Sequence, residues 1–148
     1  MRTHLPIFVL LFPAVTTSAH FADAVPQTAG QAPPKAAMAG EYDLIGRKPD
    51  STMTYSGRVT LSAEGSNLAV SRTINGKIQK GMAKFDTVAG TDRIPVLRME
   101  FVIDGVEHHA TYRWQTDPDN YFRFTGMVYL PDHRTKAPGL EALFPISK

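Results

Sequence analysis

The sequence predicts an all-β domain: an antiparallel up-and-down meander of seven to eight strands that closes into a small barrel. From Gly40 to Ile146 the chain consists of short segments in which apolar and polar residues alternate, as expected for strands with one buried face. Tight-turn sequences separate these segments, and a long meander removes its exposed edges by closing. Glycines inside strands, at Gly57, Gly81 and Gly126, are typical of sharp bends and favour the barrel. A two-sheet β-sandwich is the alternative.

The first three strands are expected at Gly40–Arg47, Tyr55–Ala63 and Leu68–Ile74. A short polar turn joins the second to the third, so the alternation of apolar residues sets their register. In that register Val59 faces Arg72, which places this arginine on the inner face. A buried arginine must lie at a barrel mouth, meet a carboxylate or await an anionic ligand, unless a bulge turns it to water.

Two dipeptides, Asn75-Gly76 and Asp104-Gly105, predict two-residue hairpin turns because both central residues tolerate a positive φ. The first leads into a fourth strand at Lys77–Phe85, whose faces are weakly patterned. The second joins strands at Ile94–Ile103 and Val106–Trp114. The residues expected to share the apolar face of this hairpin are Leu97 opposite Tyr112, Met99 opposite Ala110, Phe101 opposite His108 and Ile103 opposite Val106.

The last two segments are Phe122–Leu130 and Gly139–Ile146. The apolar pattern places the first of them with Trp114 opposite Phe122, a register that also sets small residues beside each other. The further pairs in that register are Tyr112 with Phe124, Ala110 with Gly126 and His108 with Val128. The final segment is either an eighth strand that returns to the first or one helical turn at an end of the barrel.

The segments that carry this prediction resemble small exported lipocalin-like or avidin-like β-barrels. They are the opening Gly-Glu-Tyr at Gly40–Tyr42, the strand Tyr55–Leu61 and the closing Gly139–Leu143. The Gly-x-Trp that is common in the first lipocalin strand stands here as Gly-x-Tyr. The resemblance implies a barrel domain with a non-enzymatic binding role.

The N-terminal part of the chain reads as an export signal followed by a linker. Residues 1–24 combine Arg2, an apolar run at Leu5–Val15 and small residues that suit cleavage after Ala19 or Ala24. That run is shorter than the about 20 residues of a membrane-spanning helix, so we expect no membrane span after cleavage. Residues 25–39 are rich in Pro, Ala, Gln and Gly and are expected to be a disordered tether, and residues 40–148 form the barrel domain. A periplasmic or secreted location follows.

Composition excludes several function classes. The 148 residues include no Cys, which excludes disulfides and thiolate chemistry. The 16 basic and 14 acidic residues give a formal net charge of +2, a mixed balance that does not predict nucleic-acid binding. Adjacent strand residues point to opposite faces, so His108 and His109 are not expected to share a metal, and no cofactor is expected. On the outer face we expect a surface pair of His109 with Glu100.

We expect a small apolar or amphipathic ligand to bind in or at the mouth of the barrel, without catalysis. The residues expected to line this site are Tyr55, Arg72, His108, Tyr112 and Trp114. Aromatic residues near strand ends suit a pocket entrance, and His108 is alternatively a core histidine satisfied by a hydroxyl or water.

The alternative function is an envelope or secreted interaction module. Such a module would bind a protein or a polyanion through an outer basic face formed by Arg58, Lys77, Lys80, Arg98 and Arg123. A filled barrel interior with a basic external stripe would favour this alternative over the ligand-binding one.

Overall fold

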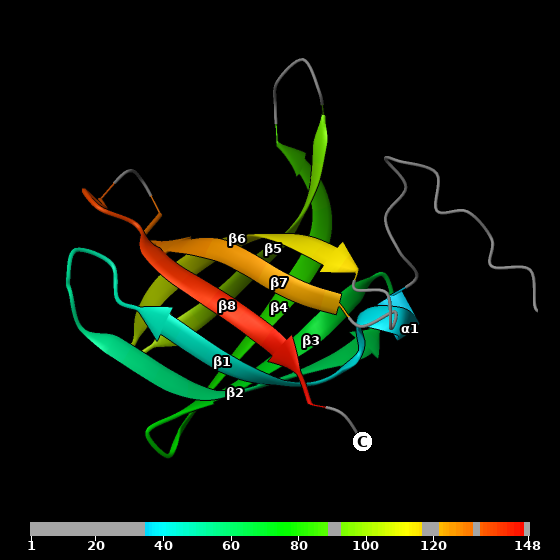
Figure 1. The fold of residues 1–148 in the computed structure, drawn as a ribbon, viewed down its shortest axis with the longest axis horizontal. Coiled ribbons are helices and arrows are strands. Elements are labelled where there is room, and N and C mark those ends of the chain that lie inside the picture. Colours follow the sequence, from blue (N-terminus) through cyan, green and yellow to red (C-terminus); the bar gives the residue numbers. More distant parts are fainter. Residues whose placement is uncertain (1–34, 89–92, 117–121, 132–133, 147–148) are drawn as a thin grey trace, which may run out of the picture.

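A computed structural model describes residues 35–88, 93–116, 122–131 and 134–146. The expected signal segment, residues 1–24, and the expected linker up to residue 34 lie outside these ranges. The described chain forms a single closed barrel in which neighbours in sequence are neighbours in the sheet, from β1 through β8 and back to β1 (Figure 1). The all-β meander and its closure are therefore confirmed.

The elements follow one another with short connections. They are α1 (Lys35–Met38), β1 (Gly40–Arg47), β2 (Thr54–Glu64), β3 (Asn67–Ile74), β4 (Lys77–Val88), β5 (Ile94–Ile103), β6 (Val106–Thr116), β7 (Phe122–Tyr129) and β8 (Gly139–Pro145). The last of these is the eighth strand, and it pairs antiparallel with both β7 and β1. Of the two interpretations of the final segment, the returning strand is confirmed.

Both hairpin dipeptides form the turns that the sequence predicts. Asn75 and Gly76 have φ values of 50° and 75°, and Asp104 and Gly105 have 48° and 81°, so both central residues of each turn are left-handed. The register of β2 with β3 and that of β5 with β6 agree with the sequence prediction, including Val59 opposite Arg72.

The predicted register of β6 with β7 is wrong by two residues. Trp114 lies opposite Phe124, and Tyr112 lies opposite Gly126. Because the shift is even, every side chain keeps its predicted face. The physical reason is shape: a Cβ added at Gly126 would lie 2.5 Å from Cδ1 of Tyr112, so the glycine makes room for a tyrosine ring and does not pair with another small residue.

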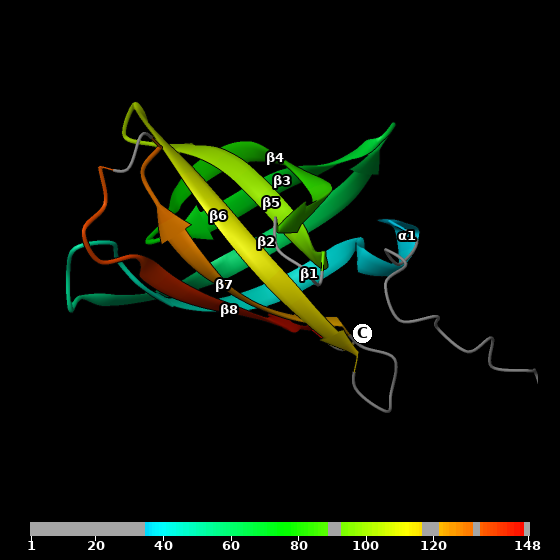
Figure 2. The ribbon, with the colours of Figure 1, turned by 90° about the horizontal axis from the view of Figure 1, so that it is seen from above.

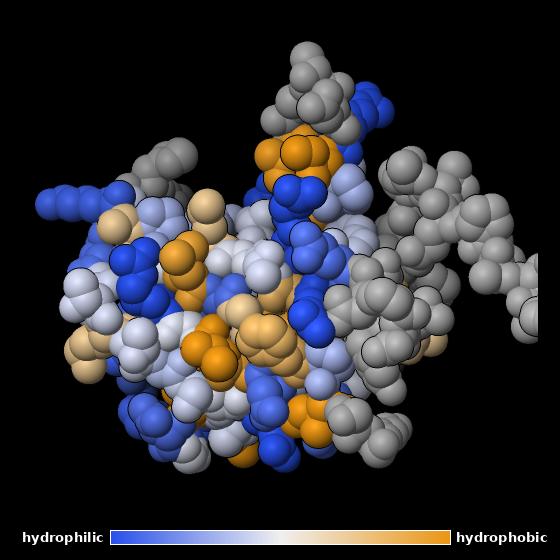
Figure 3. Space-filling model, viewed as in Figure 1, coloured by the Kyte–Doolittle hydropathy of each residue, from blue (hydrophilic) through white to orange (hydrophobic). Residues whose placement is uncertain are grey.

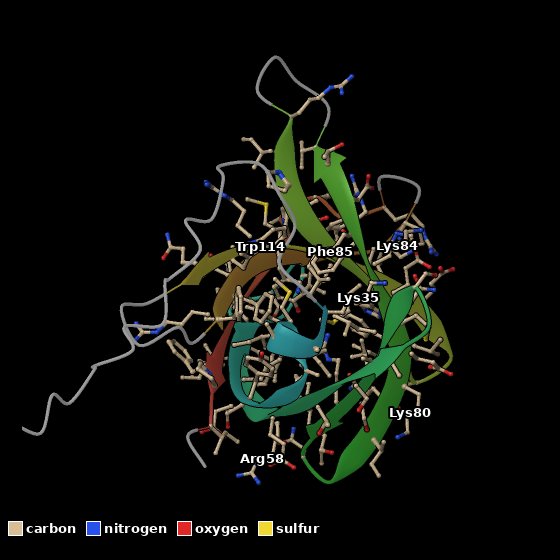
Figure 4. All side chains as sticks on the ribbon, turned by 90° about the vertical axis from the view of Figure 1, so that its right-hand side faces the viewer. Lys35, Arg58, Lys80, Lys84, Phe85 and Trp114 are labelled. Carbon is tan, nitrogen blue, oxygen red and sulfur yellow. The ribbon has the colours of Figure 1, made fainter. Side chains whose placement is uncertain are left out.

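The two ends of the barrel differ. The end that we call the plug end carries α1, which lies across the opening in the view of Figure 4. Met38 on α1 is fully buried, and its carbonyl accepts a 2.7 Å hydrogen bond from the Tyr42 hydroxyl. Lys35 donates to the Gly65 carbonyl at 3.3 Å. The ordered domain thus begins before Gly40, inside the segment that the sequence assigns to the linker.

The opposite end, which we call the open end, is formed by the β1–β2 and β7–β8 loops and by the two hairpin turns. Figures 1 and 2 show these connections at the left and α1 at the right. Between the two ends, buried side chains from the strands fill the barrel; they include Leu44, Leu61, Leu97, Met99, Tyr112, Phe124 and Leu143. Of the helices in the described ranges, none is both long and apolar enough to cross a membrane.

Candidate functional site

A pocket of about 520 Å³ opens at the open end of the barrel. Its walls are apolar side chains near the strand ends, which are Ile74, Ile103, Val128 and Leu130. Its polar lining includes Tyr55, Arg72, Gln79 and His108, and its rim includes Lys48, Asp50, Lys77 and Asp104. An apolar cleft of this size with a few placed polar groups has the usual composition of a small-molecule site.

Beside the pocket, one row of inward-facing residues crosses five neighbouring strands. The registers place Tyr55 beside Gly46, Gly46 beside Glu141, Glu141 beside Gly126, and Gly126 beside Tyr112. The row therefore reads tyrosine, glycine, glutamate, glycine, tyrosine. This order lets both phenol rings lean over a glycine towards the same carboxylate.

The two glycines of the row are required by close approach. A Cβ at Gly46 would lie 2.6 Å from Cζ of Tyr55 and 2.9 Å from Cγ of Glu141. A Cβ at Gly126 would meet Tyr112, as described above. Real Cβ atoms are not found at such distances, so any larger residue would displace the tyrosines or the carboxylate.

Glu141 is the centre of a buried polar network. Its Oε1 accepts hydrogen bonds from Tyr55 Oη and from Arg72 Nη2, the latter at 2.5 Å. Its Oε2 accepts one from Tyr112 Oη. Arg72 and Glu141 are 1% and 4% exposed. Both carboxylate oxygens are thus satisfied, and the charge of Arg72 is balanced by a partner that three donors hold in place.

The environment of the network keeps both tyrosines protonated. Burial, followed by the nearby Glu141 charge, raises the pKa of Tyr112 well above its ordinary value and raises that of Tyr55 in the same direction. Burial is the largest single influence on the pKa of Arg72 and lowers it, but the charge and hydrogen bond of Glu141 together with the two tyrosines outweigh burial, so the net change is upward. Arg72 therefore stays a cation and both phenols stay hydrogen-bond donors.

Arg72 nevertheless has donors that the protein does not use. Its Nε and Nη1 are buried without a hydrogen-bond partner in the described chain, and so is Oε1 of Gln79. Arg72 and Gln79 are directly opposite each other on β3 and β4, and both line the pocket. Below them, Cζ of Arg72 lies 3.7 Å from the ring centroid of Phe101, which holds the guanidinium by a cation–π contact.

The rim of the pocket carries both signs of charge. Lys77 Nζ lies 2.8 Å from Asp104 Oδ1. Oδ1 of Asp50 accepts from the backbone N–H groups of Lys136 and Ala137 at 3.0 and 2.7 Å. The acidic and basic residues of rim and floor balance: Lys48, Arg72 and Lys77 against Asp50, Asp104 and Glu141.

The structure brings three of the five expected ligand-binding residues together. Tyr55, Arg72 and His108 line the pocket, and Tyr112 lies in the network that supports its floor.

Trp114 does not belong to this site. It packs edge-on against Phe85, with ring centroids 5.7 Å apart, towards the plug end, where Figure 4 labels both. The expectation that it stands at the entrance of this pocket is wrong because β6 runs away from the open end.

The two neighbouring histidines have separate roles, as the alternation of faces predicts. His108 is half-buried, stacks on Phe101 at 6.0 Å, and has Nδ1 2.9 Å from the Val106 carbonyl. His109 lies opposite Glu100 in the register, but its Nε2 contacts Glu107 at 2.9 Å. The expected His109–Glu100 pair is therefore wrong, because Glu100 instead meets Lys84 at 3.3 Å.

Sequence reasoning missed two residues of the site, Glu141 and Gln79. Of the two interpretations of Gly139–Ile146, the strand would by alternation place Glu141 on the same inner face as Leu143. Gln79 lies on β4, where the pattern of the sequence does not separate the two faces. The pairing of β3 with β4 places Gln79 opposite Arg72, and the pairing of β8 with β1 places Glu141 opposite Gly46.

A second recess, the outer groove, lies on the outside of the barrel below the β4–β5 hairpin. It has a volume of about 930 Å³ and runs over β1, β8, β7, β6 and β5, with Thr54 of β2 and Val88 of β4 at its border. Its exposed apolar side chains are Ile45, Val88, Ile94, Met127 and Leu140. Figure 3 shows apolar side chains in the middle of this face and on the stem of the hairpin above it.

The cations expected to form an outer basic face do not form one stripe. Arg58 lies 3.9 Å from both Glu41 and Asp43, and Arg98 lies 2.5 Å from Asp86. Lys77 pairs with Asp104, as described above, Lys80 donates to Ser71 at 3.0 Å, and Arg123 is not free either. In Figure 4 the labelled Arg58 and Lys80 project from different parts of the barrel wall.

In the described ranges, no group of three or more His, Cys, Asp or Glu residues is placed to hold a metal ion.

Comparison with known proteins adds no family to this geometry. No family model matches the chain, and no curated protein matches its sequence.

Proposed function

We propose that this protein is a non-enzymatic binding protein that holds a small amphipathic molecule in the open-end pocket. The observation that carries the proposal is the pair of unused donors on Arg72. Buried polar groups in folded proteins nearly always have a hydrogen-bond partner, and an unpaired one is costly. A bound polar group that accepts from Nε or Nη1 would remove that cost.

The shape of the pocket supports the same ligand class. Its volume of about 520 Å³ falls within the ordinary range for small-molecule sites. Ile74, Ile103, Val128 and Leu130 would contact an apolar part of the ligand, while Arg72 and Gln79 would meet a polar part deeper in. A molecule with one polar end and an apolar body matches this arrangement.

Catalysis has less support than binding. A general base needs an acceptor free to take a proton from a substrate, but both oxygens of Glu141 already accept hydrogen bonds from protein donors. His108 Nδ1 is engaged with a backbone carbonyl. The network therefore serves to hold Arg72 in position.

The binding proposal can be tested with N-phenyl-1-naphthylamine, an uncharged fluorescent probe of apolar sites. We expect its emission to rise on addition of the protein. Ile103→Trp, which fills the pocket wall, should abolish the rise. Val102→Trp is the matched control, because Val102 is the next residue on β5 and is 50% exposed on the outside. Equal emission with both variants would contradict the proposed site.

The outer groove supports a second candidate, an interaction module. Arg47 lines the groove, and its buried Nε has no hydrogen-bond partner in the described chain. Arg113 lies on the same face. The partner that fits is a protein segment that presents apolar side chains next to an acidic residue, since the groove is apolar and its flanking cations are arginines.

This second candidate predicts that Met127→Glu weakens binding of such a segment. A synthetic amphipathic peptide with apolar and acidic residues is a suitable probe. Val102→Glu is the control, because Val102 is also exposed but lies on the part of β5 away from the groove. Loss of binding in both variants, or in neither, would contradict the groove as the docking surface.

We also propose that the protein is exported and works in the periplasm or outside the cell. The apolar run at Leu5–Val15 with small residues after it supports this location. The absence of cysteine from the sequence is compatible with it, since the barrel is held by packing. N-terminal sequencing of the mature protein should begin at His20 or Val25, and an intact Met1 in an intracellular fraction would contradict export.

A further inference from the structure

We infer that the open-end pocket selects a ligand whose polar head is uncharged and both accepts and donates hydrogen bonds, such as a primary amide, over a carboxylate of the same length. This inference rests on the proposed function and names the class of ligand. It follows from the juxtaposition of a charge-balanced arginine with an unpaired acceptor at the floor of one apolar pocket.

The first step concerns charge. A lone buried arginine would favour an anionic ligand, but Arg72 already has Glu141 at 2.5 Å. Tyr55 and Tyr112 both donate to Glu141, so the carboxylate is held on Arg72 and does not give way to a competitor. An anionic head would thus be buried near a second negative charge, and would lose its hydration without gaining an unbalanced cation.

The second step concerns the rim, which does not favour an anion either. Lys77 is paired with Asp104, and Asp50 lies on the same rim as Lys48. Because two cations, Lys48 and Lys77, face two anions, Asp50 and Asp104, the rim creates little net field to attract an anion or a cation. The rim charges therefore do not attract an anion to the pocket, and the charge of Arg72 at the floor remains balanced by Glu141.

The third step concerns hydrogen bonds. Arg72 is 1% exposed, and two of its donor nitrogens, Nε and Nη1, have no hydrogen-bond partner in the described chain. Gln79 is 8% exposed and offers an unused acceptor, Oε1. The two residues are opposite each other across β3 and β4, where side chains of a strand pair meet. A head group that satisfies both must accept from the arginine and donate to the glutamine, which an amide does and an ionised carboxylate does not.

The decisive experiment compares three probes with the same chain: octanamide, octanoate and octylamine. Each is titrated against the complex with N-phenyl-1-naphthylamine at about pH 8, where the carboxylate and the amine are charged. We expect octanamide to displace the fluorophore at a concentration about tenfold lower than either charged probe, a difference well within what unpaired buried groups produce. Octanoate that displaces as well as octanamide would overturn the inference and leave the proposed function standing.

Two variants test the two physical causes separately. Glu141→Gln removes the balancing charge, so the preference should move about tenfold towards octanoate. An unchanged ratio in a folded variant would overturn the argument from charge. Gln79→Leu removes the acceptor without touching the ion pair, so it should weaken octanamide but not methyl octanoate, which only accepts. Equal effects on both would overturn the argument from hydrogen bonding.

Failure of the inference and failure of the proposed function give different results. If none of the three probes displaces the fluorophore and calorimetry detects no binding of octanamide, both the proposed function and the inference fail. If a charged probe is preferred and Ile103→Trp still abolishes binding, the pocket is the binding site and only the selectivity is refuted.

Discussion

The two ends of this barrel are built on the same strands but differ in chemistry. At the plug end, Met38 and Tyr42 close the interior with apolar surface and one hydrogen bond to a helix carbonyl. At the open end, Arg72 and Glu141 form a buried ion pair below a pocket. Removing water from two charges is expensive and an apolar filling is often as stable, so stability alone does not account for the buried ion pair of the open end.

The largest effect is expected from breaking the ion pair on one side only. Glu141→Leu leaves the Arg72 guanidinium buried without a counter-ion, and the free energy of unfolding should fall by about 3–5 kcal/mol. Urea unfolding followed by far-UV circular dichroism measures this change. The control is Arg72→Met combined with Glu141→Leu, which removes both charges and should cost less than Glu141→Leu alone.

A double variant as unstable as Glu141→Leu would contradict the view that the uncompensated charge is the main cost. It would indicate instead that packing around Glu141 dominates the stability of the open end.

The next effect separates stability from binding within the core. Met99→Ala and Phe101→Ala each remove a buried side chain that is 1% or 2% exposed, and each should cost about 2–5 kcal/mol. Phe101 contacts the Arg72 guanidinium through its ring, with Cζ of Arg72 3.7 Å from the ring centroid. We therefore expect Phe101→Ala also to weaken N-phenyl-1-naphthylamine binding, measured by fluorescence titration on folded protein, whereas Met99→Ala should not. Unchanged urea midpoints in both variants would contradict their place in the core.

A smaller effect is expected from adding a side chain at a glycine that neighbouring groups approach closely. Gly46→Ala places a methyl group against Tyr55 and Glu141, and such overpacking should cost about 1–3 kcal/mol. Ile45→Ala is the control: Ile45 is the adjacent residue, is 58% exposed on the outside, and should change the urea midpoint little. If Gly46→Ala unfolds at the wild-type midpoint, the tyrosine–glutamate row is looser than described.

The smallest effect is expected in mildly alkaline solution. Burial raises the pKa of Tyr42 to about 12. Burial first and the Glu141 charge second raise the pKa of Tyr112 well above its ordinary value. A pKa that is raised on folding contributes stability that is complete below the unfolded value, about 10. That stability is lost as pH rises through the folded-state value. Stability should therefore begin to fall near pH 10, and Tyr112→Phe should reduce the slope.

Absorbance at the tyrosinate band, combined with urea midpoints at each pH, checks this effect. Stability that rises between about pH 9 and pH 11 would contradict the burial of these phenols.

The sequence predicts much of the fold because two-residue turns set registers. Asn75-Gly76 and Asp104-Gly105 fix where strands reverse, and alternation then decides which side chains face inward. The connection between β6 and β7 is longer, so it leaves the register free. The sequence prediction pairs the small residues Ala110 and Gly126, and this places β7 two residues from its actual register with β6. A glycine can accommodate the ring of Tyr112 as well as it can pair with an alanine.

The candidate site was predictable only in part. The inward position of Arg72 follows from its place opposite Val59, and a carboxylate partner is one of the alternatives that burial demands. Its actual partner, Glu141, lies 69 residues away on the strand that closes the barrel. Turn signals and alternation relate residues that are near in sequence. Closure of the barrel brings together strands that no turn connects, so these rules do not predict the pairing of Arg72 with Glu141. Trp114 was misplaced for a related reason: a strand end can belong to either end of a barrel.

The most direct test of the central claim is to map a bound molecule onto the two ends by nuclear magnetic resonance. Titration of ¹⁵N-labelled protein with octanamide should shift the Arg72 Nε–H resonance and the amides of Gln79, Ile103 and His108, while Met38 and the Trp114 indole stay unchanged. Shifts that centre on Met38 and Trp114, or an Arg72 Nε–H resonance that does not respond to bound octanamide, would contradict the account.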